Sequence, residues 1–458
     1  MTDRPNVLFV ILDSARRDRV SLYGHDRPTT PTLESLAGES TVFDNAYTPT
    51  PWTLPSHCSM FTGEFPSEHG VTNGFADRRP ALPEATETLA ERLSDRGYRT
   101  AGFSNNPWVG TLSGLHRGFE EFVEWDLEIT SESDAGIHDR RDRLYSRFHT
   151  LLAQAARQPV FLLKRPFFTA NLAGRAGEWV RATADDPRPS FTFVNLMEAH
   201  SPYFPPDEAF EALDLPTPGP IEPRLLNTRL LAYVLGKTSL DGDDRRRVLE
   251  YYDACLRYQD GKLAELLDAY RREGLFEDTL VVICADHGKT LGEFPRDGEP
   301  SHYLRDLNTN VPLVVKEPGQ REGDRVGDPV ELRELFGLMA EPGASVDSLA
   351  REHALTEDHI PHTGTTAEEV TRWRVISGRD HRLARSESGE QYLFRRGAST
   401  VDERVIPAPD ETEPAVLAEL SDALDARLAG LSETDDRGDA DEEIAGATQA
   451  QLRDLGYL

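Results

Sequence analysis

The sequence predicts an α/β fold in which helices cover both faces of a mostly parallel sheet. Short apolar runs rich in Val, Ile and Leu recur along the chain, and stretches with helical spacing lie between them. The runs lack the alternation of a half-exposed strand, which is typical of strands buried on both faces. A chain of 458 residues can bury such a core and carry a smaller appendage.

The first predicted strand is Asn6–Leu12, a continuous apolar run. The others are Arg99–Ser104, Phe191–Leu196, Thr279–Ala285 and Val311–Lys316. Helical spacing indicates a helix over Thr88–Arg96, which stops at Gly97, and a long helix over Arg246–Glu273, ended by Gly274. Strands that alternate with helices in this way favour an α/β sandwich.

The other regions give weaker signals. Leu127–Asp186 has weak periodicity and is predicted to form helical excursions over the face that carries the site. Residues 371–396 alternate as short strands, most clearly Trp373–Ile376 and Gln391–Arg395, so we expect a small antiparallel subdomain near the C-terminus. Glu433–Glu443 is charge-dense and indicates a solvated linker, and the tail after it regains apolar spacing and is expected to dock back.

The composition is that of a strongly acidic protein. The formal net charge is -30, with 80 acidic against 50 basic residues. The lysines are Lys164, Lys237, Lys262, Lys289 and Lys316. Such a surface repels nucleic acid and anionic membranes, so neither is an expected partner. An acidic surface poor in lysine suits high salt, where its self-repulsion is screened. We therefore hypothesise a halophilic source.

The cysteines and the N-terminus bear on the compartment. Cys58, Cys255 and Cys284 lie far apart, without the paired spacing of a disulfide framework or a metal knuckle. Met1–Pro5 leads straight into an apolar strand, without a basic start or a small-residue cleavage site. That strand is far too short to span a membrane. We expect a cytoplasmic protein.

Two predicted strands end in residues that bind cations. The first is followed by Asp13, and the Thr279–Ala285 strand by Asp286-His287-Gly288. In open α/β sheets, ligands bind beyond the carboxyl ends of the strands. Two carboxylates and an imidazole are therefore expected to meet at one edge of the sheet, a set suited to a divalent cation. The alternative is that Asp13 caps a turn and Asp286 caps a loop.

A second cluster surrounds Thr53, within the segment Thr50–Gly63. Pro55 is suited to the first turn of a helix, which puts Thr53 just before the helix N-terminus. A hydroxyl there faces unpaired backbone N–H groups and the positive end of the helix dipole, which favour an alkoxide and a bound anion. Thr53 is thus a candidate nucleophile. The alternative, and the commoner role for such a threonine, is a simple N-cap.

Taken in order along the chain, these segments resemble the sulfatase family of the alkaline phosphatase superfamily. Sulfatases have a strand ending in aspartates, Cys/Ser-x-Pro-x-Arg before a helix ending in Thr-Gly, Pro-x-x-His-Gly, an Asp-Asn or Asp-His pair, and Val-Pro-Leu leading to lysine. The matching segments are Asp13, Thr53-Leu-Pro55-Ser-His57, Thr62-Gly63, Pro66-Ser-Glu-His69-Gly70, Glu198-Ala-His200-Ser-Pro202-Tyr203, Asp286-His287-Gly288, Val311-Pro312-Leu313-Val-Val-Lys316 and Leu452-Arg-Asp-Leu-Gly-Tyr457. The match covers most of the chain, with gaps at about 127–186 and 207–245.

The resemblance implies an alkaline-phosphatase-like three-layer sandwich. The expected domains are a catalytic α/β domain over residues 1–345, an α+β subdomain over 346–430, and an acidic linker with a docking tail over 431–458. The implied metal ligands are Asp13, Thr53, Asp286 and His287. Thr53 would be the nucleophile as well, because a metal ion lowers the pKa of a hydroxyl.

The resemblance also implies three residues that contact the ester. His200 and Lys316 would hold its non-bridging oxygens, where charge develops, and His302 would be a further ligand or an acid for the leaving group. Each has an alternative. Lys316 could be paired on an acidic surface, His200 could be a buried loop histidine, and His302 could be an exposed one.

Three positions depart from the sulfatase pattern. Ser14 stands where the family usually has a second metal-binding aspartate, and His57 replaces the arginine that supports the modified nucleophile. Sulfatases oxidise Cys or Ser to formylglycine, whereas the secondary alcohol of Thr53 could give only a ketone. Thr53 must therefore form a covalent ester that water later cleaves. Nucleotide pyrophosphatase, phosphodiesterase and phosphoethanolamine or lipoteichoic-acid synthase relatives use this route, which favours phosphorus; the overall resemblance favours sulfate.

One divalent metal ion is expected. Two-metal relatives need an aspartate four residues before the position of His200, where this chain has Leu196. Oxygen ligands with one imidazole suit Mn²⁺, Mg²⁺ or Ca²⁺, and Zn²⁺ is compatible. The Gly-Lys-Trp-His segment of sulfatases is missing. Asn105 and Asn106 stand in that region, and they can hydrogen-bond a substrate without adding charge.

The predicted function is metal-dependent hydrolysis of a sulfate or phosphate (di)ester of a small molecule or glycan. One alternative is a transferase that passes a phospho-group to a sugar or lipid acceptor, although known transferases of this type are usually membrane-anchored. The other is a non-catalytic member that binds esters, although retention of Thr53 with its metal ligands argues against a decayed site. The alcohol part of the substrate would be recognised by Leu127–Asp186 and Asp207–Asp244. The oligomeric state is left open.

Overall fold

The apolar run after Asn6 forms the centre of a large sheet. In the computed structural model, β1 (Asn6–Leu12) pairs in parallel with β5 (Ser190–Leu196) on one side and with β6 (Thr279–Cys284) on the other. The side chains from Val7 to Leu12 are all buried. The structure describes residues 4–72, 81–124, 171–234, 236–294, 302–341, 344–359, 372–397, 400, 403–406 and 414–432.

The large sheet has eight strands in the order β4-β3-β5-β1-β6-β7-β2-β8. The remaining strands are β2 (Thr41–Tyr47), β3 (Arg99–Ser104), β4 (Glu121–Glu124), β7 (Asn310–Lys316) and β8 (Asp324–Glu331). β7 runs antiparallel to both of its neighbours, β6 and β2. All other neighbours pair in parallel. The predicted fold class, with a mostly parallel central sheet, is confirmed.

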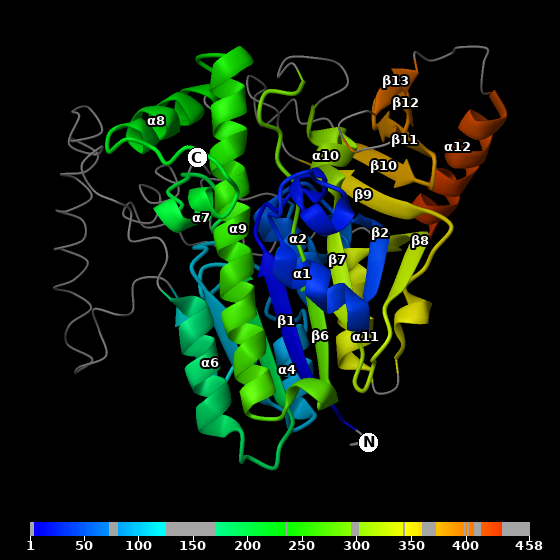
Figure 1. Cartoon of the computed structure of the whole chain (residues 1–458). Helices are drawn as coiled ribbons and strands as arrows, with labels where there is room; N and C mark the ends of the chain where they lie inside the picture. The colour runs from blue at the N-terminus through cyan, green and yellow to red at the C-terminus, as the bar shows by residue number, and fades with distance from the viewer. Residues whose placement is uncertain are drawn as a thin grey trace, which may run out of the picture.

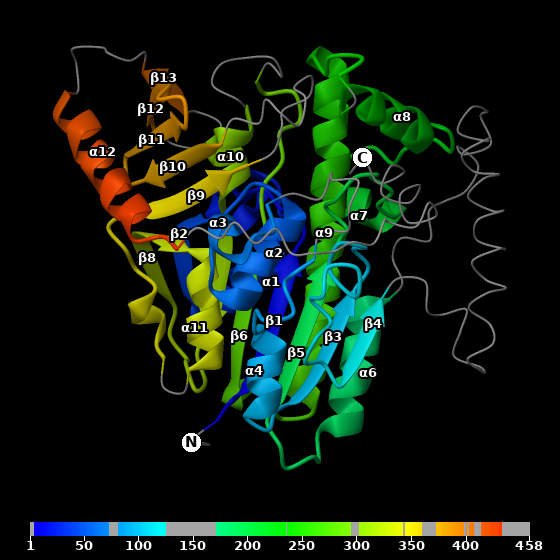
Figure 2. The same cartoon turned by 180° about the vertical axis from the view of Figure 1, so that it is seen from behind.

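Helices form a layer on each face of this sheet (Figures 1 and 2). The layer nearer the viewer in Figure 1 contains α1 (Pro31–Leu36), α6 (Leu172–Thr183) and α9 (Gly242–Arg272). The opposite layer, nearer the viewer in Figure 2, contains α2 (Thr53–Thr62), α4 (Leu89–Asp95) and α11 (Leu335–Ala340). Further helices are α3 (Pro66–His69), α7 (Asp207–Glu211), α8 (Glu222–Val234) and α10 (Asp306–Thr309).

The two helices predicted from sequence are present. Thr88 caps α4, because its Oγ1 accepts a hydrogen bond from the Glu91 amide, and Gly97 has a φ of 81° just beyond the helix. The long helix α9 begins at Gly242, a few residues before its predicted start. The sequence predicts that Leu127–Asp186 forms helical excursions over the site. For the end of this range that the structure describes, the prediction is wrong, because α6 packs against α9 and β5 in the helix layer that covers the sheet.

A smaller antiparallel sheet near the C-terminus confirms the second subdomain. Its order is β13-β12-β11-β10-β9. The strands are β9 (Ala354–Asp358), β10 (Trp373–Ser377), β11 (His381–Ser386), β12 (Gln391–Arg395) and β13 (Arg404–Ile406), with α12 (Pro414–Ala429) packed against β10 and β11. Buried ion pairs join this sheet to the large one. Arg382 pairs with Glu403 at 2.6 Å and with Asp306 at 3.1 Å.

Several sequence predictions concern residues outside the described ranges. These are most of Leu127–Asp186, the linker Glu433–Glu443 and the tail Gln451–Leu458, so the predictions for them stay predictions. Among the helices of the described residues, none combines the length and the apolar character needed to cross a membrane.

Candidate active site

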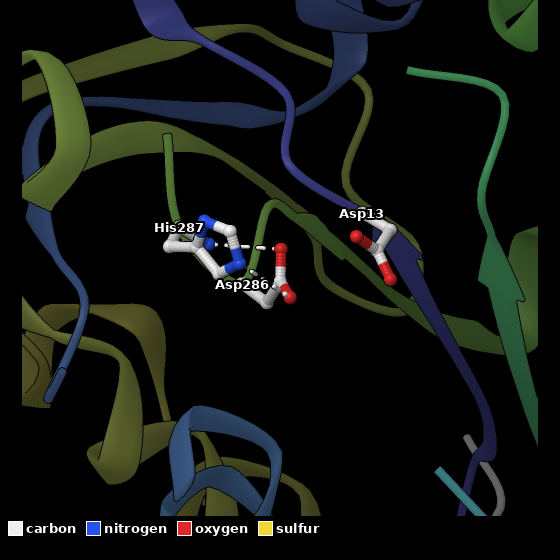
Figure 3. A group of neighbouring side chains, drawn as sticks. All are labelled: Asp13, Asp286 and His287. Atoms are coloured by element: carbon white, nitrogen blue, oxygen red, sulfur yellow. Dashed lines mark hydrogen bonds and ion pairs between the residues drawn. The ribbon is translucent and has the colours of Figure 1, made fainter. Parts of the chain in front are cut away.

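Asp13, Asp286 and His287 meet at one edge of the large sheet, as predicted. Asp13 follows β1, and Asp286 follows the parallel neighbour β6. One possible ligand atom from each of the three side chains lies within 4.8 Å of the others. Figure 3 shows the two carboxylates facing the same space with the imidazole beside them.

Three donors orient the carboxylate of Asp13. Its Oδ1 accepts a hydrogen bond from Ser14 Oγ at 3.0 Å, and its Oδ2 accepts from Asn106 Nδ2 at 2.8 Å and from Asn195 Nδ2 at 3.3 Å. The sequence indicated Asn106 as a side chain that can hydrogen-bond a substrate, and in the structure its amide donates to the carboxylate of Asp13. Asn195 was missed, although it lies one residue before the end of β5, at the strand edge where ligands gather.

The carboxylate of Asp286 leaves one oxygen for a cation. Its Oδ1 accepts hydrogen bonds from the backbone amides of Ser14 (2.8 Å) and His287 (2.9 Å). Its Oδ2 is buried and has no hydrogen-bond partner among the described residues. An unsatisfied buried carboxylate oxygen is costly, and a bound cation removes that cost. The residues present therefore fit a divalent metal ion.

Ser14 connects the two aspartates. Its φ of 59° lies in the left-handed region, which is uncommon for a residue with a side chain. This conformation turns the Ser14 amide to Asp286 and the hydroxyl to Asp13. Tyr252 of α9 donates a hydrogen bond to the Ser14 carbonyl at 2.8 Å and fixes this turn. Ser14 thus arranges the ligands without adding the negative charge of the usual aspartate.

His287 presents a lone pair to the site. Its Nδ1 donates a hydrogen bond to the Gly288 carbonyl at 2.6 Å, so the neutral ring has its lone pair on Nε2. A Cβ at Gly288 would lie 1.9 Å from the Leu307 carbonyl oxygen, so only glycine allows this turn. The His287 side chain keeps 12% of its area exposed, which leaves a route to solvent.

The hydroxyl of Thr53 contacts this ring. Thr53 is the first residue of α2, and its Oγ1 lies 3.0 Å from Nε2 of His287. The N-cap residue is Trp52, and no side chain caps this helix end. The alternative in which Thr53 is a simple N-cap is therefore wrong. Thr53 is 3% exposed and lies at the positive end of the helix dipole.

His57 lies behind the nucleophile candidate. Its Nδ1 donates a hydrogen bond to the Thr53 carbonyl at 2.8 Å and lies 3.8 Å from Oδ2 of Asp286. The ring is fully buried. His57 thus braces the first turn of α2 against the metal site from the position where sulfatases have arginine.

The small C-terminal sheet holds the loop that precedes Thr53. Thr356 Oγ1 donates to the Thr48 carbonyl at 2.7 Å, and the Glu357 amide donates to the Pro49 carbonyl at 2.8 Å. The Trp52 indole donates to Asp358 Oδ1 at 3.2 Å. These contacts join segments some 300 residues apart in the sequence, so no local signal could have predicted them.

The prediction for Lys316 is wrong. β7 is antiparallel, and Lys316 pairs with Val281 near the amino end of β6. Asp286 follows Val281 by five residues. At about 3.3 Å per residue, Lys316 therefore lies roughly 16 Å from Asp286 along the strand direction. Lys316 Nζ donates to the carbonyls of Phe276 (3.4 Å) and Glu317 (3.2 Å). The strand pattern was right, but its direction was not visible in the sequence.

His200 does lie near the site, in a form that differs from the predicted one. Burial lowers its pKa to about 3, the charge of Lys289 acts in the same direction, and Asp13 opposes both. Its Nδ1 donates to the Ser201 carbonyl at 2.6 Å, which leaves Nε2 with a lone pair. In the neutral ring Nε2 accepts a hydrogen bond, so the predicted contact with an ester oxygen requires a protonated His200.

Two further residues, His302 and Lys289, bear on the candidate site. The backbone of His302 starts a short 3-10 helix (His302–Leu304), but its side chain is outside what the structure describes, so its role stays a prediction. Lys289 was not considered as a site residue. Its Nζ donates to Ser201 Oγ at 2.7 Å, and the charges of Asp13 and Asp286 act on it. Its position, three residues after Asp286, could have revealed it.

This fold and this site define a hydrolase of the alkaline phosphatase superfamily, whose members cleave sulfuric or phosphoric esters. The chain belongs to the sulfatase family, because the family model described as Sulfatase matches residues 5–336.

Curated relatives agree with that membership. The chain is 26% identical to a sulfatase of Formosa agariphila over 76% of this chain and 72% of the relative. It is 26% identical to the choline-sulfatase of Rhizobium meliloti over 70% of this chain and 64% of the relative. It is 23% identical to an ulvan-active sulfatase of Formosa agariphila over 94% of this chain and 82% of the relative.

Solved structures share the fold. The phosphonate monoester hydrolase from Silicibacter pomeroyi superposes with a TM-score of 0.69 at 20% identity, over 94% of this chain and 96% of that one. The corresponding enzyme of Agrobacterium radiobacter gives a TM-score of 0.66 at 18% identity, over 93% and 96%.

Proposed function

We propose that this sulfatase-family hydrolase cleaves its ester through Thr53, beside one divalent metal ion. The observation that carries the proposal is the 3.0 Å contact between Thr53 Oγ1 and Nε2 of His287, in a histidine grouped with Asp13 and Asp286. A threonine used only as a helix cap would direct its hydroxyl at the backbone of α2, and Thr53 does not.

Asp13, Asp286, His287 and Thr53 would hold the metal ion. The bound ion would lower the pKa of the hydroxyl and offset the charge of the ester oxygens. Carboxylate and hydroxyl oxygens with one imidazole suit Mn²⁺, Mg²⁺ or Ca²⁺, and Zn²⁺ is compatible. The unpaired Asp286 Oδ2 supports a cation at this point.

Hydrolysis would take two displacement steps. In the first, Oγ1 of Thr53 forms a bond to the sulfur or phosphorus atom while the bond from that atom to the alcohol oxygen breaks. The alcohol leaves with that electron pair and gains a proton, which balances the proton lost by Thr53. In the second step a water oxygen attacks the same atom, the bond to Thr53 breaks, and the threonine recovers a proton from the water.

Two considerations bear on the substrate class. The curated relatives are named sulfatases, including choline-sulfatase and an ulvan-active enzyme, which favours a sulfate ester of a small molecule or a glycan. The likeness to phosphonate monoester hydrolases and the alcohol of Thr53, which cannot become formylglycine, favour a phosphorus ester. We infer a singly charged ester: a sulfate monoester, phosphonate monoester or phosphodiester.

A matched pair of variants tests the nucleophile. We expect Thr53→Ala to lower kcat at least about a thousandfold, and Thr53→Ser, which keeps a hydroxyl, to retain measurable turnover. The measurement is turnover of 4-nitrophenyl sulfate, 4-nitrophenyl phenylphosphonate and bis(4-nitrophenyl) phosphate with Mn²⁺, Mg²⁺ and Ca²⁺. Full activity of Thr53→Ala on all three esters would rule out Thr53 as the nucleophile.

We also propose that the protein works at high salt. A net charge of -30 gives strong self-repulsion, which salt screens. The free energy of unfolding should therefore rise from low to multimolar KCl. Equal stability at both salt concentrations would refute this part of the proposal.

A further inference from the structure

The proposed function needs a positive group for the charged oxygens of the ester, and neither residue predicted for it supplies one. Lys316 lies at the other end of the sheet. His200 is neutral, and its Nε2 has a lone pair instead of a proton. During the displacement, negative charge develops on the oxygens of the ester, and hydrogen-bond donors directed at those oxygens stabilise it. Among the residues whose side chains the structure describes, the site therefore lacks an assigned cation besides the proposed metal ion.

Lys289 lies where such a cation is needed. It follows the ligands Asp286 and His287 after Gly288, whose turn only glycine permits. The side chain is half-buried, and its Nζ contacts Ser201 in the loop that also carries His200. Burial lowers the pKa of Lys289 to about 8, while the charges of Asp13 and Asp286 oppose this shift.

The ammonium of Lys289 has donors to spare. A lysine ammonium carries three N–H donors. One goes to Ser201 Oγ, and among the described residues Nζ makes no other hydrogen bond and no ion pair. Two donors are thus available at a half-buried position next to the metal ligands. Leaving them unsatisfied costs free energy that an anionic ligand would recover.

The structural alternative is that Lys289 only offsets the charges of Asp13 and Asp286. A lysine with that role would use its flexible stem to form an ion pair with one of the two carboxylates. Lys289 instead contacts a neutral hydroxyl across the site, within reach of both charges but paired with neither. Its position thus suits a ligand that enters between the metal ligands and the Ser201 loop.

We propose that Lys289 binds a charged non-bridging oxygen of the ester, the role that resemblance to sulfatases gives to Lys316. This inference rests on the proposed function for the identity of the ligand. With two ligand carboxylates, one divalent ion and Lys289, the site carries a net charge of about +1, which complements a singly charged ester.

Binding of two unreactive anions tests the proposal without any turnover. Methanesulfonate and inorganic sulfate are both tetrahedral at sulfur, but they carry one and two negative charges. Their dissociation constants would be measured by calorimetry on the Mn²⁺-loaded wild type, Lys289→Met and Lys289→Arg. Arg272→Met, which removes a charge from the exposed last turn of α9, is the matched control.

A Coulombic contact predicts losses that grow with the charge of the anion. Lys289→Met should raise the dissociation constant of methanesulfonate about tenfold and that of sulfate about a hundredfold. Lys289→Arg should recover part of both losses, and Arg272→Met should change neither constant more than twofold. Mn²⁺ should bind Lys289→Met more tightly than wild type, because a positive charge near Asp13 and Asp286 is gone.

Two results would overturn the proposal. Unchanged affinity of Lys289→Met for both anions would mean that the ammonium does not touch the ligand. An equal loss for both anions together with weaker Mn²⁺ binding would mean that Lys289 only supports the structure. A fully active Thr53→Ala would instead refute the nucleophile, and the two failures are therefore distinguishable.

Discussion

The two ends of the large sheet carry lysines with opposite surroundings. At the carboxyl ends of β1 and β6, Lys289 lies beside the proposed metal ligands, and one hydrogen bond, to Ser201, is all that its ammonium makes within the described part of the chain. At the other end, Lys316 is fully buried, its ammonium bonds to two backbone carbonyls, and it lies 4.8 Å from the ring centroid of Phe276. Both lysines follow or end a strand. Because β7 runs antiparallel to β6, Lys316 lies at the end of the sheet away from the candidate site, whereas Lys289 lies at the end where a substrate could bind.

The two ends of the sheet also differ in the contacts that hold them together. The carboxyl end is assembled from β1, β6, α2 and a loop held by the small sheet, so its side chains come from distant segments. The opposite end is held by local contacts between β6, β7 and the turns beside them. Changes at the first end should alter chemistry and metal binding, and changes at the second should alter stability alone.

After Thr53→Ala, the largest effect is expected for Asp286→Asn. The amide keeps the shape of the side chain but removes the charge beside the metal ion, so we expect Mn²⁺ affinity and kcat each to fall at least about a hundredfold. Calorimetric Mn²⁺ titration and ester turnover provide the measurements. If the variant bound Mn²⁺ as tightly as the wild type, the ligand set would be wrong.

Glu357 offers a pH test of the contact between the small sheet and α3. Burial raises the pKa of Glu357, but the hydrogen bond and charge of His359, with Ser67 and Arg374, outweigh it and lower the pKa from 4.5 to about 2. The carboxylate therefore stabilises the fold above pH 4.5, and this contribution is lost as pH falls from about 5 towards 2.

The comparison of wild type with Glu357→Gln isolates that contribution. The wild type should lose up to roughly 3 kcal/mol more unfolding free energy than the variant over this pH range. Denaturant unfolding followed by circular dichroism at each pH gives the difference. Parallel stability curves for the two proteins would show that folding does not lower the pKa of Glu357.

A moderate effect is expected at Trp52. Trp52→Phe keeps an aromatic ring beside Thr53 but removes the indole donor to Asp358. Because the loop then holds Thr53 less firmly, kcat should fall about tenfold while Mn²⁺ affinity, which depends on β1 and β6, stays within twofold. Trp179→Phe in α6 is the control. A rise in KM alone would indicate a substrate contact instead of positioning.

The smallest effect on chemistry is expected for Lys316→Met. Methionine replaces the ammonium in a buried position whose partners are neutral carbonyls, so the free energy of unfolding should change by about 1–2 kcal/mol. The kcat and KM values should stay within twofold of the wild type. A hundredfold loss of kcat in a variant with normal Mn²⁺ affinity would restore Lys316 to the site.

Sequence reasoning reached the grouping of Asp13, Asp286 and His287 because it depends on local rules. Asp13 and Asp286 each end an apolar run, and parallel neighbours bring such ends to one edge. The antiparallel direction of β7 has no signature in its apolar pattern, so Lys316 was misplaced. Tyr252 and Asp358 reach the site from an α9 face and from the second sheet. Such long-range contacts are set by packing.

The most direct test is the position of a metal ion in crystals grown with Mn²⁺. Anomalous diffraction above the manganese edge should place a peak bonded to Asp13, Asp286 and His287, with the Thr53 oxygen in the same coordination sphere. A peak elsewhere, or a manganese site that the Thr53 oxygen does not approach, would contradict a metal-activated threonine.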